Sequence, residues 1–211
     1  MLNSAVPTAT PDLTALCPGI WIWQNYDSSV KADLFSSALA VASGLYLVDP
    51  IPLTEPTLDE LPKLAPVLGI IVTNANHHRS AAAYSERFSV PVLAHARAFE
   101  DSKLARFNEI ENGARISGEL EVIEIEGAVA GEIALYHPIN GGTLIVGDAL
   151  INFDPYGFAF LPRKYCLKEK KMRRSLRQLL ARPAERMLFA HGAPILSGVS
   201  ARLQQLLDFD L

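Results

Sequence analysis

Side chains that could carry out acid–base or metal chemistry lie in four segments, each at the end of a short apolar run. The segments span residues 47–50, 71–80, 144–149 and 189–194. Their polar candidates are, in chain order, Asp49, Asn74, Asn76, His77, His78, Arg79, Asp148 and His191. Functional groups usually lie on loops at strand ends, and imidazole together with carboxylate suits a transition metal or an ion pair. The pattern therefore predicts one site assembled from four distant parts of the chain.

Short strands and a few helices must position these residues. Apolar runs predict strands over 19–26, 36–42, 44–49, 68–73, 91–94, 120–125, 132–137, 143–147 and 187–189. Apolar periodicity and capping residues predict helices over 57–64, 80–88, 168–180 and 199–209. The strand–helix–strand passage over 68–94 requires parallel pairing, whereas the glycines that follow Asn140 predict an antiparallel hairpin. Residues 96–113 are ambiguous, partly helical and rich in charge.

Length and composition fit one folded unit. The 211 residues are 49% hydrophobic and 20% charged, which is ordinary for a globular chain. A first stretch over 1–18, rich in Thr, Pro, Ala and Ser, is expected to be a loose arm. We therefore expect a single domain over 1–211.

The charge pattern disfavours a nucleic-acid partner. The net charge is −4 and the sequence pI is near 5.7, whereas phosphate backbones are bound by clustered positive charge. A basic run over 164–177 is interpreted as the solvated face of a helix. The two cysteines, Cys17 and Cys166, form no CxxC motif, and no secretory leader or long apolar run is present. These features predict a cytoplasmic protein with no membrane partner.

The order of the four segments resembles the metallo-β-lactamase-fold superfamily over nearly the full length. That family has a strand ending in Val-Asp-Pro, then Thr-His-x-His-x-Asp-His, Gly-His-Thr-x-Gly, strand-Gly-Asp and strand-x-His-Gly. The counterparts here are Val48-Asp49-Pro50, the segment 73–79, the segment 126–131, Gly147-Asp148 and His191-Gly192. The resemblance implies a four-layer αββα sandwich of two mixed β-sheets, with the four segments meeting at the seam between the sheets.

Most of the metal ligands of that family are replaced. The family's ligand positions are occupied by Asn74, Asn76, His78, Arg79, Ala128, Asp148 and His191. Only Asp148, which usually bridges two metals, and His191 keep the family's residue type. Since a neutral amide is a poor zinc ligand and alanine is none, the resemblance implies that the first metal position is lost.

Two hypotheses follow for the second metal position. His78, Asp148 and His191 could hold one zinc or iron ion on a two-histidine, one-carboxylate face. Alternatively, the permanently charged Arg79 pairs with Asp148 through a charge-assisted hydrogen bond and takes the place of the ion. We favour the second hypothesis, which predicts no bound cofactor.

The same two hypotheses separate two functions. The favoured one is a hydrolase-like protein that binds a small molecule, with weak or no metal-dependent hydrolysis. The alternative is a mononuclear hydrolase of a small ester or thioester, in which His78, Asp148 and His191 act in catalysis. A nuclease of this fold is disfavoured because the chain is acidic and lacks the paired-metal motif.

Further residues are expected around the pocket. His77 is interpreted as a solvated or hydrogen-bonded loop histidine beside Asn74, Asn76 and Arg79. Tyr156 lies in an aromatic loop over 152–165, which is expected to form a substrate rim or a contact in a homo-oligomer.

Overall fold

The computed structural model describes residues 9–10, 12–100 and 107–209. The strands are β1 (Thr14–Cys17), β2 (Ile20–Asp27), β3 (Ala32–Val41), β4 (Gly44–Val48), β5 (Val67–Val72), β6 (Val92–Ala94), β7 (Asn108–Glu109), β8 (Arg115–Ile116), β9 (Leu120–Glu124), β10 (Ile133–His137), β11 (Thr143–Val146), β12 (Leu150–Phe153), β13 (Gly157–Phe160) and β14 (Arg186–Phe189). The α-helices are α1 (Glu55–Leu58), α2 (Leu61–Leu64), α3 (Ala81–Phe88), α4 (Glu169–Leu176) and α5 (Val199–Asp208). Short 3₁₀ turns occur at η1 (Ala96–Ala98), η2 (Ile139–Gly141), η3 (Arg163–Tyr165) and η4 (Arg177–Ala181).

The strands form two mixed sheets and a separate hairpin. The first sheet has the order β1-β2-β3-β4-β5-β6-β7, antiparallel as far as β4 and parallel from β4 to β7. The second has the order β14-β11-β10-β9-β8, in which only β11 and β14 are parallel. β12 and β13 pair with each other as an antiparallel hairpin.

Alternation along the strands separates three apolar layers. On β10, Ile133 and Leu135 belong to the core between the sheets, whereas Ala134 belongs to the core under α4 and α5. On β5, Ile71 faces the other sheet and Ile70 faces the layer that contains α3. This two-residue period is what a sheet buried on both faces requires.

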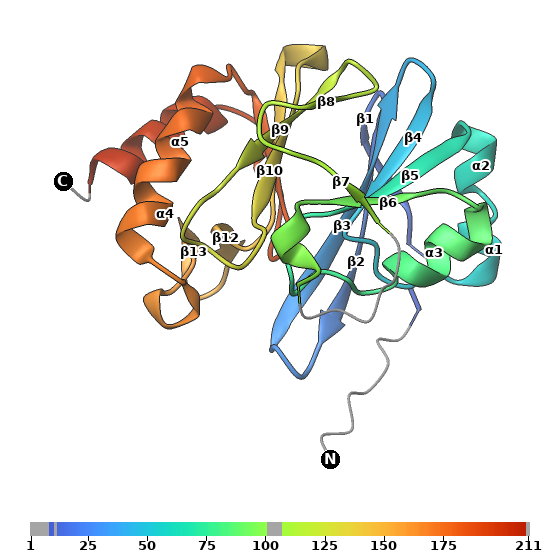
Figure 1. The fold of residues 1–211 in the computed structure, drawn as a ribbon, viewed down its shortest axis with the longest axis horizontal. Coiled ribbons are helices and arrows are strands. Elements are labelled where there is room, and N and C mark those ends of the chain that lie inside the picture. Colours follow the sequence, from blue (N-terminus) through green and yellow to red (C-terminus); the bar gives the residue numbers. More distant parts are fainter. Residues whose placement is uncertain (1–8, 11, 101–106, 210–211) are drawn as a thin grey trace.

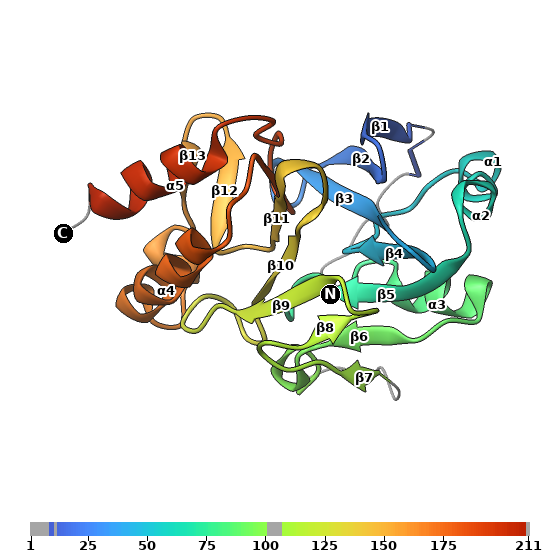
Figure 2. The same ribbon diagram turned by 90° about the horizontal axis from the view of Figure 1, so that it is seen from above.

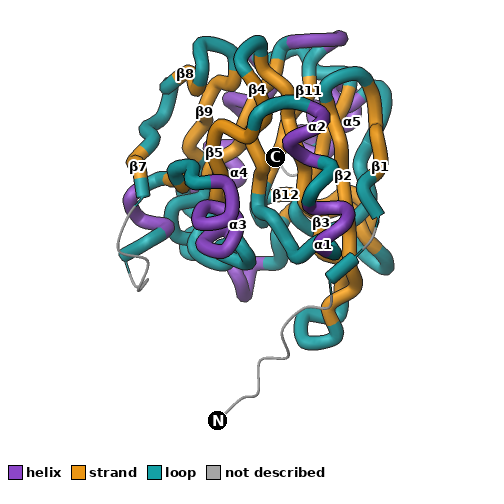
Figure 3. The backbone as a smooth tube through the Cα atoms, turned by 90° about the vertical axis from the view of Figure 1, so that its right-hand side faces the viewer, coloured by secondary structure: helices purple, strands orange, loops and turns teal. Residues whose placement is uncertain are grey.

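The helices cover the two outer faces. Figures 1 and 2 show α1, α2 and α3 outside the first sheet and α4 and α5 outside the second. Seen from the side of α3 in Figure 3, the first group of helices lies in front of the strands and the second group behind them. The predicted four-layer αββα sandwich of two mixed sheets is confirmed.

The structure differs from the sequence expectations in three local places. The helix predicted over 57–64 is divided into α1 and α2, because Pro62 has no amide hydrogen to continue the first helix. The β12–β13 hairpin lies where the sequence predicts a loop. Part of the expected N-terminal arm forms β1, which pairs with β2, while residues 1–8 and 11 lie outside the described residues.

Among the described residues, no helix combines the length and apolar character that a membrane crossing requires.

Candidate metal site

Four strand ends meet at one edge of the sandwich. β4 and β5 are parallel neighbours in the first sheet, and β11 and β14 are parallel neighbours in the second. The carboxyl ends of parallel neighbours lie at the same sheet edge. The two edges are joined by a bridge between Leu34 and His191, with Phe35 N donating to Ala190 O at 2.9 Å. The loops that follow these strands therefore converge.

His77, Asp148 and His191 form the group with metal-ligand spacing in the part of the chain that the structure describes. One ligand atom of each lies within 4.8 Å of the others. His77 Nε2 and His191 Nε2 are each 3.2 Å from the same oxygen, Asp148 Oδ1. The side chains of His77 and Asp148 are 2% and 8% exposed, compared with 17% for His191. The group thus opens toward solvent on the side of His191.

Asp49 and Thr73 hold the other side of the His77 ring. His77 Nδ1 is 2.9 Å from Asp49 Oδ2, which can only accept a hydrogen bond when ionised, so Nδ1 carries a proton. Thr73 donates to the same carboxylate from its backbone nitrogen at 2.8 Å and from its hydroxyl at 2.5 Å. Asp49 therefore fixes the orientation of the ring, with Nε2 directed to Asp148.

A tight turn explains why His77 points inward. Asn74 Oδ1 accepts from Asn76 N at 2.8 Å, and Asn74 O accepts from His77 N at 3.1 Å. Such an asparagine turn reverses the chain within a few residues. Position-by-position transfer of the family motif does not anticipate this conformation, because asparagines replace the histidines that give the motif its shape.

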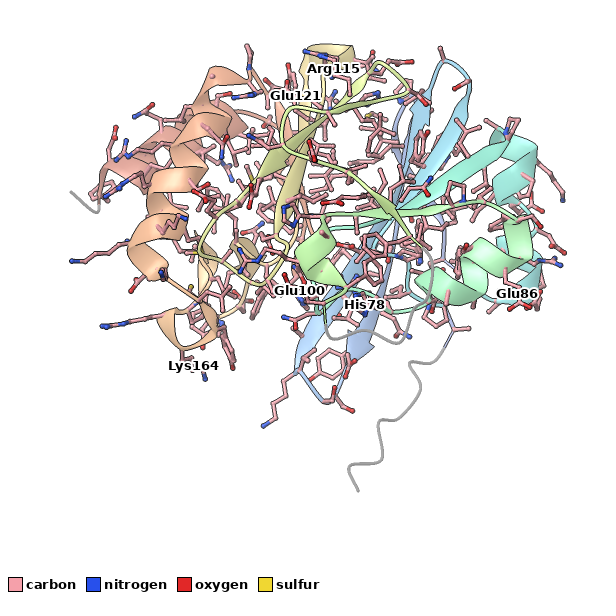
Figure 4. The ribbon with its side chains drawn as sticks, viewed as in Figure 1. His78, Glu86, Glu100, Arg115, Glu121 and Lys164 are labelled. Atoms are coloured by element: carbon pink, nitrogen blue, oxygen red, sulfur yellow. The ribbon has the colours of Figure 1, made fainter. Side chains whose placement is uncertain are left out.

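The structure places His78 away from the group in which it was expected. Its Nε2 is 2.7 Å from Ala98 O, and its ring stacks on Phe99 with centroids 4.4 Å apart. In Figure 4, His78 lies at the lower edge of the molecule near the short helix η1. The turn at Asn74 rotates His77, rather than His78, toward Asp148.

Arg79 also differs from expectation. Its guanidinium donates to three backbone oxygens, Phe35 O at 2.7 Å, Asp49 O at 2.9 Å and Ala190 O at 3.2 Å. Among the described residues, the expected hydrogen bond from Arg79 to Asp148 is not formed. Asn76 Nδ2 donates to Asp148 Oδ2 instead, at 3.0 Å. Arg79 thus joins β3 to two site loops and leaves the space beside Asp148 Oδ1 free of its guanidinium.

Glu132 is a site residue that sequence reasoning missed. Its side chain is 1% exposed, with Oε2 accepting from Asn74 Nδ2 at 2.7 Å and Oε1 accepting from Ala149 N at 3.0 Å. The available signal was a single acidic residue at the start of a strand that is otherwise apolar. Ala128, at the family's other lost ligand position, is buried in the core under α4.

The buried charges strongly affect one another. Burial lowers the pKa of His77, but Asp148 and Asp49 outweigh it and raise the value to about 9. Burial would raise the pKa of Asp148, yet His77 and His191 hold it well below its usual range. Burial and the nearby Asp148 raise the pKa of Glu132 to about 8, and burial lowers that of His191. Without an ion, a protonated His77 therefore balances the carboxylates of Asp49 and Asp148.

The β12–β13 hairpin borders the His191 loop and carries Tyr156. Asn152 N donates to His191 O at 3.2 Å, and Ala193 N donates to Asn152 O at 3.0 Å. Tyr156 is 57% exposed and packs edge-on against Phe153, with centroids 5.6 Å apart. Its side chain therefore lies on a hairpin that is anchored beside His191.

The fold and the position of this group define the class of protein. The chain belongs to the metallo-β-lactamase superfamily, whose sequence profile matches residues 14–209. The DIM-1 metallo-β-lactamase is 16% identical, with a TM-score of 0.76 over 96% of this chain and 99% of that one.

Two further solved structures have the same fold at similar distance. A metallo-β-lactamase from Erythrobacter litoralis is 19% identical, with a TM-score of 0.73 over 93% of this chain and 96% of that one. A metallo-β-lactamase family protein from Thermus thermophilus is 20% identical, with a TM-score of 0.67 over 92% of this chain and 80% of that one. No curated protein sequence matches the chain significantly. At these identities, the structural likeness extends to the fold alone.

Proposed function

We propose that this protein is a mononuclear metal-dependent hydrolase whose ion is held by His77, Asp148 and His191. The main observation in support of this proposal is the spacing of the donor atoms. Ligands of a tetrahedral zinc ion at about 2.0–2.1 Å are roughly 3.3 Å apart. The two nitrogen-to-oxygen separations of 3.2 Å match this value. Two of the three donor separations therefore suit one ion, and all three donor atoms lie within 4.8 Å of one another.

The hydrogen bonding of His77 supports the same proposal. Its Nε2 is buried and has no hydrogen-bond partner among the residues that the structure describes, although Asp148 Oδ1 is 3.2 Å away. Its Nδ1 is satisfied by Asp49. A carboxylate that accepts from the far nitrogen of a histidine ligand is the usual support of a metal site, since it fixes the tautomer and orients the ring.

Each residue would have a separate role in such a site. A bound zinc or iron ion would supply Lewis acidity to polarise a carbonyl oxygen and would lower the pKa of water. His77 and Asp148 form the buried part of the ligand set, and the more exposed His191 faces the substrate side. Arg79 fixes the backbone next to His191 and Asp49. The substrate class, a small ester or thioester, is proposed by analogy with the superfamily.

A second candidate function is metal-free binding of a small molecule. It is favoured by the position of His77 between two carboxylates, with Nδ1 2.9 Å from Asp49 Oδ2 and Nε2 3.2 Å from Asp148 Oδ1. An imidazolium there can balance both charges without an ion. The two functions differ in whether the group takes up metal.

Metal analysis of the intact protein separates the two functions. We expect about one equivalent of zinc or iron after purification without added metal, and hydrolysis of a chromogenic ester or thioester that a chelator abolishes. His77→Ala should lose the ion, whereas the adjacent His78→Ala should keep it. Absence of metal even after incubation with zinc would overturn the proposal in favour of metal-free binding. Loss of the ion in His78→Ala alone would refute the ligand assignment.

A further inference from the structure

Hydrogen bonds form a closed ring behind Asp148, in which Glu132 and Asn74 are buried and Asn76 is exposed. Glu132 accepts from Asn74 Nδ2 at 2.7 Å, and Asn74 Oδ1 accepts from Asn76 N at 2.8 Å. Asn76 Nδ2 donates to Asp148 Oδ2 at 3.0 Å, and Glu132 accepts from the next backbone nitrogen, Ala149 N, at 3.0 Å. The loop of Asp148 is thus held through both its side chain and its backbone.

Because Gly147 has no β-carbon, there is room beside it for this ring of hydrogen bonds. A β-carbon at this position would lie 2.8 Å from Glu132 Oε1 and 2.9 Å from Asn74 Nδ2. Two members of the ring, Asn74 and Asn76, occupy positions at which the family has metal ligands. Asn74 Oδ1 is already used within the ring as the acceptor from Asn76 N, so the two amides do not present a free pair of oxygens to a second cation.

The two oxygens of Asp148 consequently have different roles. Oδ1 faces His77 Nε2 and His191 Nε2, both at 3.2 Å, whereas Oδ2 accepts from the amide of Asn76. An amide N–H directed at Oδ2 carries positive partial charge where a second metal ion would have to approach. A carboxylate held in this way offers a single oxygen to metal.

We propose that Glu132, Asn74 and Asn76 are positioning residues that hold Asp148 as a one-oxygen ligand and limit the site to one ion. The limit to one ion rests on the proposed function. The positioning of Asp148 by these residues applies to the metal-free protein as well. At two positions where the family has ligands of its first metal ion, this chain has Asn74 and Asn76, whose hydrogen bonds hold Asp148, the proposed ligand of the remaining ion.

Glu132→Gln is the sharpest test, because the side chain keeps its shape while one oxygen that can accept a hydrogen bond, in the acid as well as in the carboxylate, is replaced by an amide nitrogen that can only donate. It must lose the bond to either Asn74 or Ala149 N. Changes in such supporting groups weaken metal binding about 10–100-fold. We expect zinc titration of the metal-free protein to give one equivalent for wild type and for Glu132→Gln, with the affinity of the variant lowered by about that factor. The matched control is Asn112→Ala, which removes an exposed hydrogen bond to Glu124 N and should bind zinc like wild type.

A second measurement needs no metal. In the metal-free protein, the buried side-chain amide protons of Asn74 and the backbone amide proton of Ala149, which both donate to Glu132, should exchange slowly with solvent by NMR, and Glu132→Gln should speed up this exchange. If wild type binds one ion and the variant binds it equally tightly, the inference fails and the proposed function stands. If wild type takes up two ions, the inference also fails. If it takes up none, the proposed function fails, and the exchange rates decide: faster exchange in the variant supports the positioning of Asp148, and unchanged exchange overturns it.

Discussion

Arg79 shows how one substituted residue can take on a different task. Its guanidinium is held by three backbone carbonyls, those of Phe35, Asp49 and Ala190. Arginine offers five donors in a rigid fork, so it can join several chain segments at once. At a position where the superfamily has a metal ligand, this chain therefore has a cross-link between loops.

Removing that cross-link should destabilise the protein. We expect Arg79→Ala to lower the free energy of unfolding by about 3 kcal/mol, because three buried carbonyls lose a charged donor. Urea unfolding followed by circular dichroism would measure the loss. The matched control is Arg87→Ala, which breaks an exposed ion pair with Asp59 and should cost less than about 1 kcal/mol. Equal losses in the two variants would contradict the proposed role of Arg79.

His137 is a second residue whose surroundings make a prediction. It lies at the end of β10 and is 0% exposed, and in the described part of the chain neither ring nitrogen has a hydrogen-bond partner. Burial lowers its pKa below the ordinary value of 6.5. The folded protein therefore favours the neutral ring, which is costly to protonate in place.

The sign of the resulting pH dependence follows from linkage. The contribution of His137 to stability is fully present above pH 6.5 and is lost as the pH falls from there toward the lower folded pKa. Replacing it with an uncharged side chain in His137→Met should make the free energy of unfolding fall less between pH 7 and 5 than in wild type. Urea titrations at both values would test this. An identical decrease in the variant would show that other groups cause it.

At the scale of elements, the contact between β12 and the His191 loop depends on Gly192. This residue has φ +97°, and a β-carbon there would lie 2.1 Å from Asn152 O. The hairpin and the last strand end can approach each other only because no side chain intervenes. The position of His191 therefore depends on a glycine at its carboxyl side.

Gly192→Ala should be more harmful than the same change at a glycine that also has a positive φ but has open space around it. Gly118 has φ +77° and open space around its β-carbon position, so Gly118→Ala should cost only the strain of about 1–2 kcal/mol. Gly192→Ala should add about 1–3 kcal/mol of steric conflict. Thermal unfolding of both variants would measure the difference, and equal costs would show that the hairpin adjusts freely.

The strands also show which parts of the fold could be predicted from the sequence. The strands β3, β4, β5 and β11 were predictable because their apolar runs are buried on both faces. The β12–β13 hairpin was not, because the sequence around Asp154-Pro155 has the composition of a loop. In the site, Asp148 and His191 could be predicted from the residues that precede them. The exchange of His78 for His77 could not, because it depends on a side-chain turn at Asn74 that spacing alone does not express.

At the scale of the whole molecule, part of the basic segment 164–177 pairs with acidic side chains of the same chain. Lys171 pairs with Glu126 at 2.7 Å, Arg173 with Glu169 at 2.7 Å and Arg177 with Asp208 at 3.5 Å. Figure 4 shows Lys164 at the start of this region, on the α4 side of the molecule. These pairs support the interpretation of the segment as a solvated helix face.

The expected consequence is weak attraction to nucleic acid. At a salt concentration of about 0.15 M, we expect no retained complex with single- or double-stranded DNA in a mobility-shift assay, because the net charge of −4 opposes the remaining cations of this segment. A complex that persists at this salt and weakens on mutation of Lys168 and Lys170 would contradict the prediction.

The bridge between Leu34 and His191 has a consequence for the order of assembly. Its two residues are separated by most of the chain, and β11 gains its parallel neighbour only when β14 is present. On a ribosome, β3, β4 and β5 emerge long before β14, so the first sheet can form while one side of β11 is still unpaired. Contacts between such distant residues form slowly and leave edges exposed in the meantime. The newborn chain therefore has a period in which the first sheet can exist but the candidate metal site does not, and chaperones that shield strand edges would act in that interval.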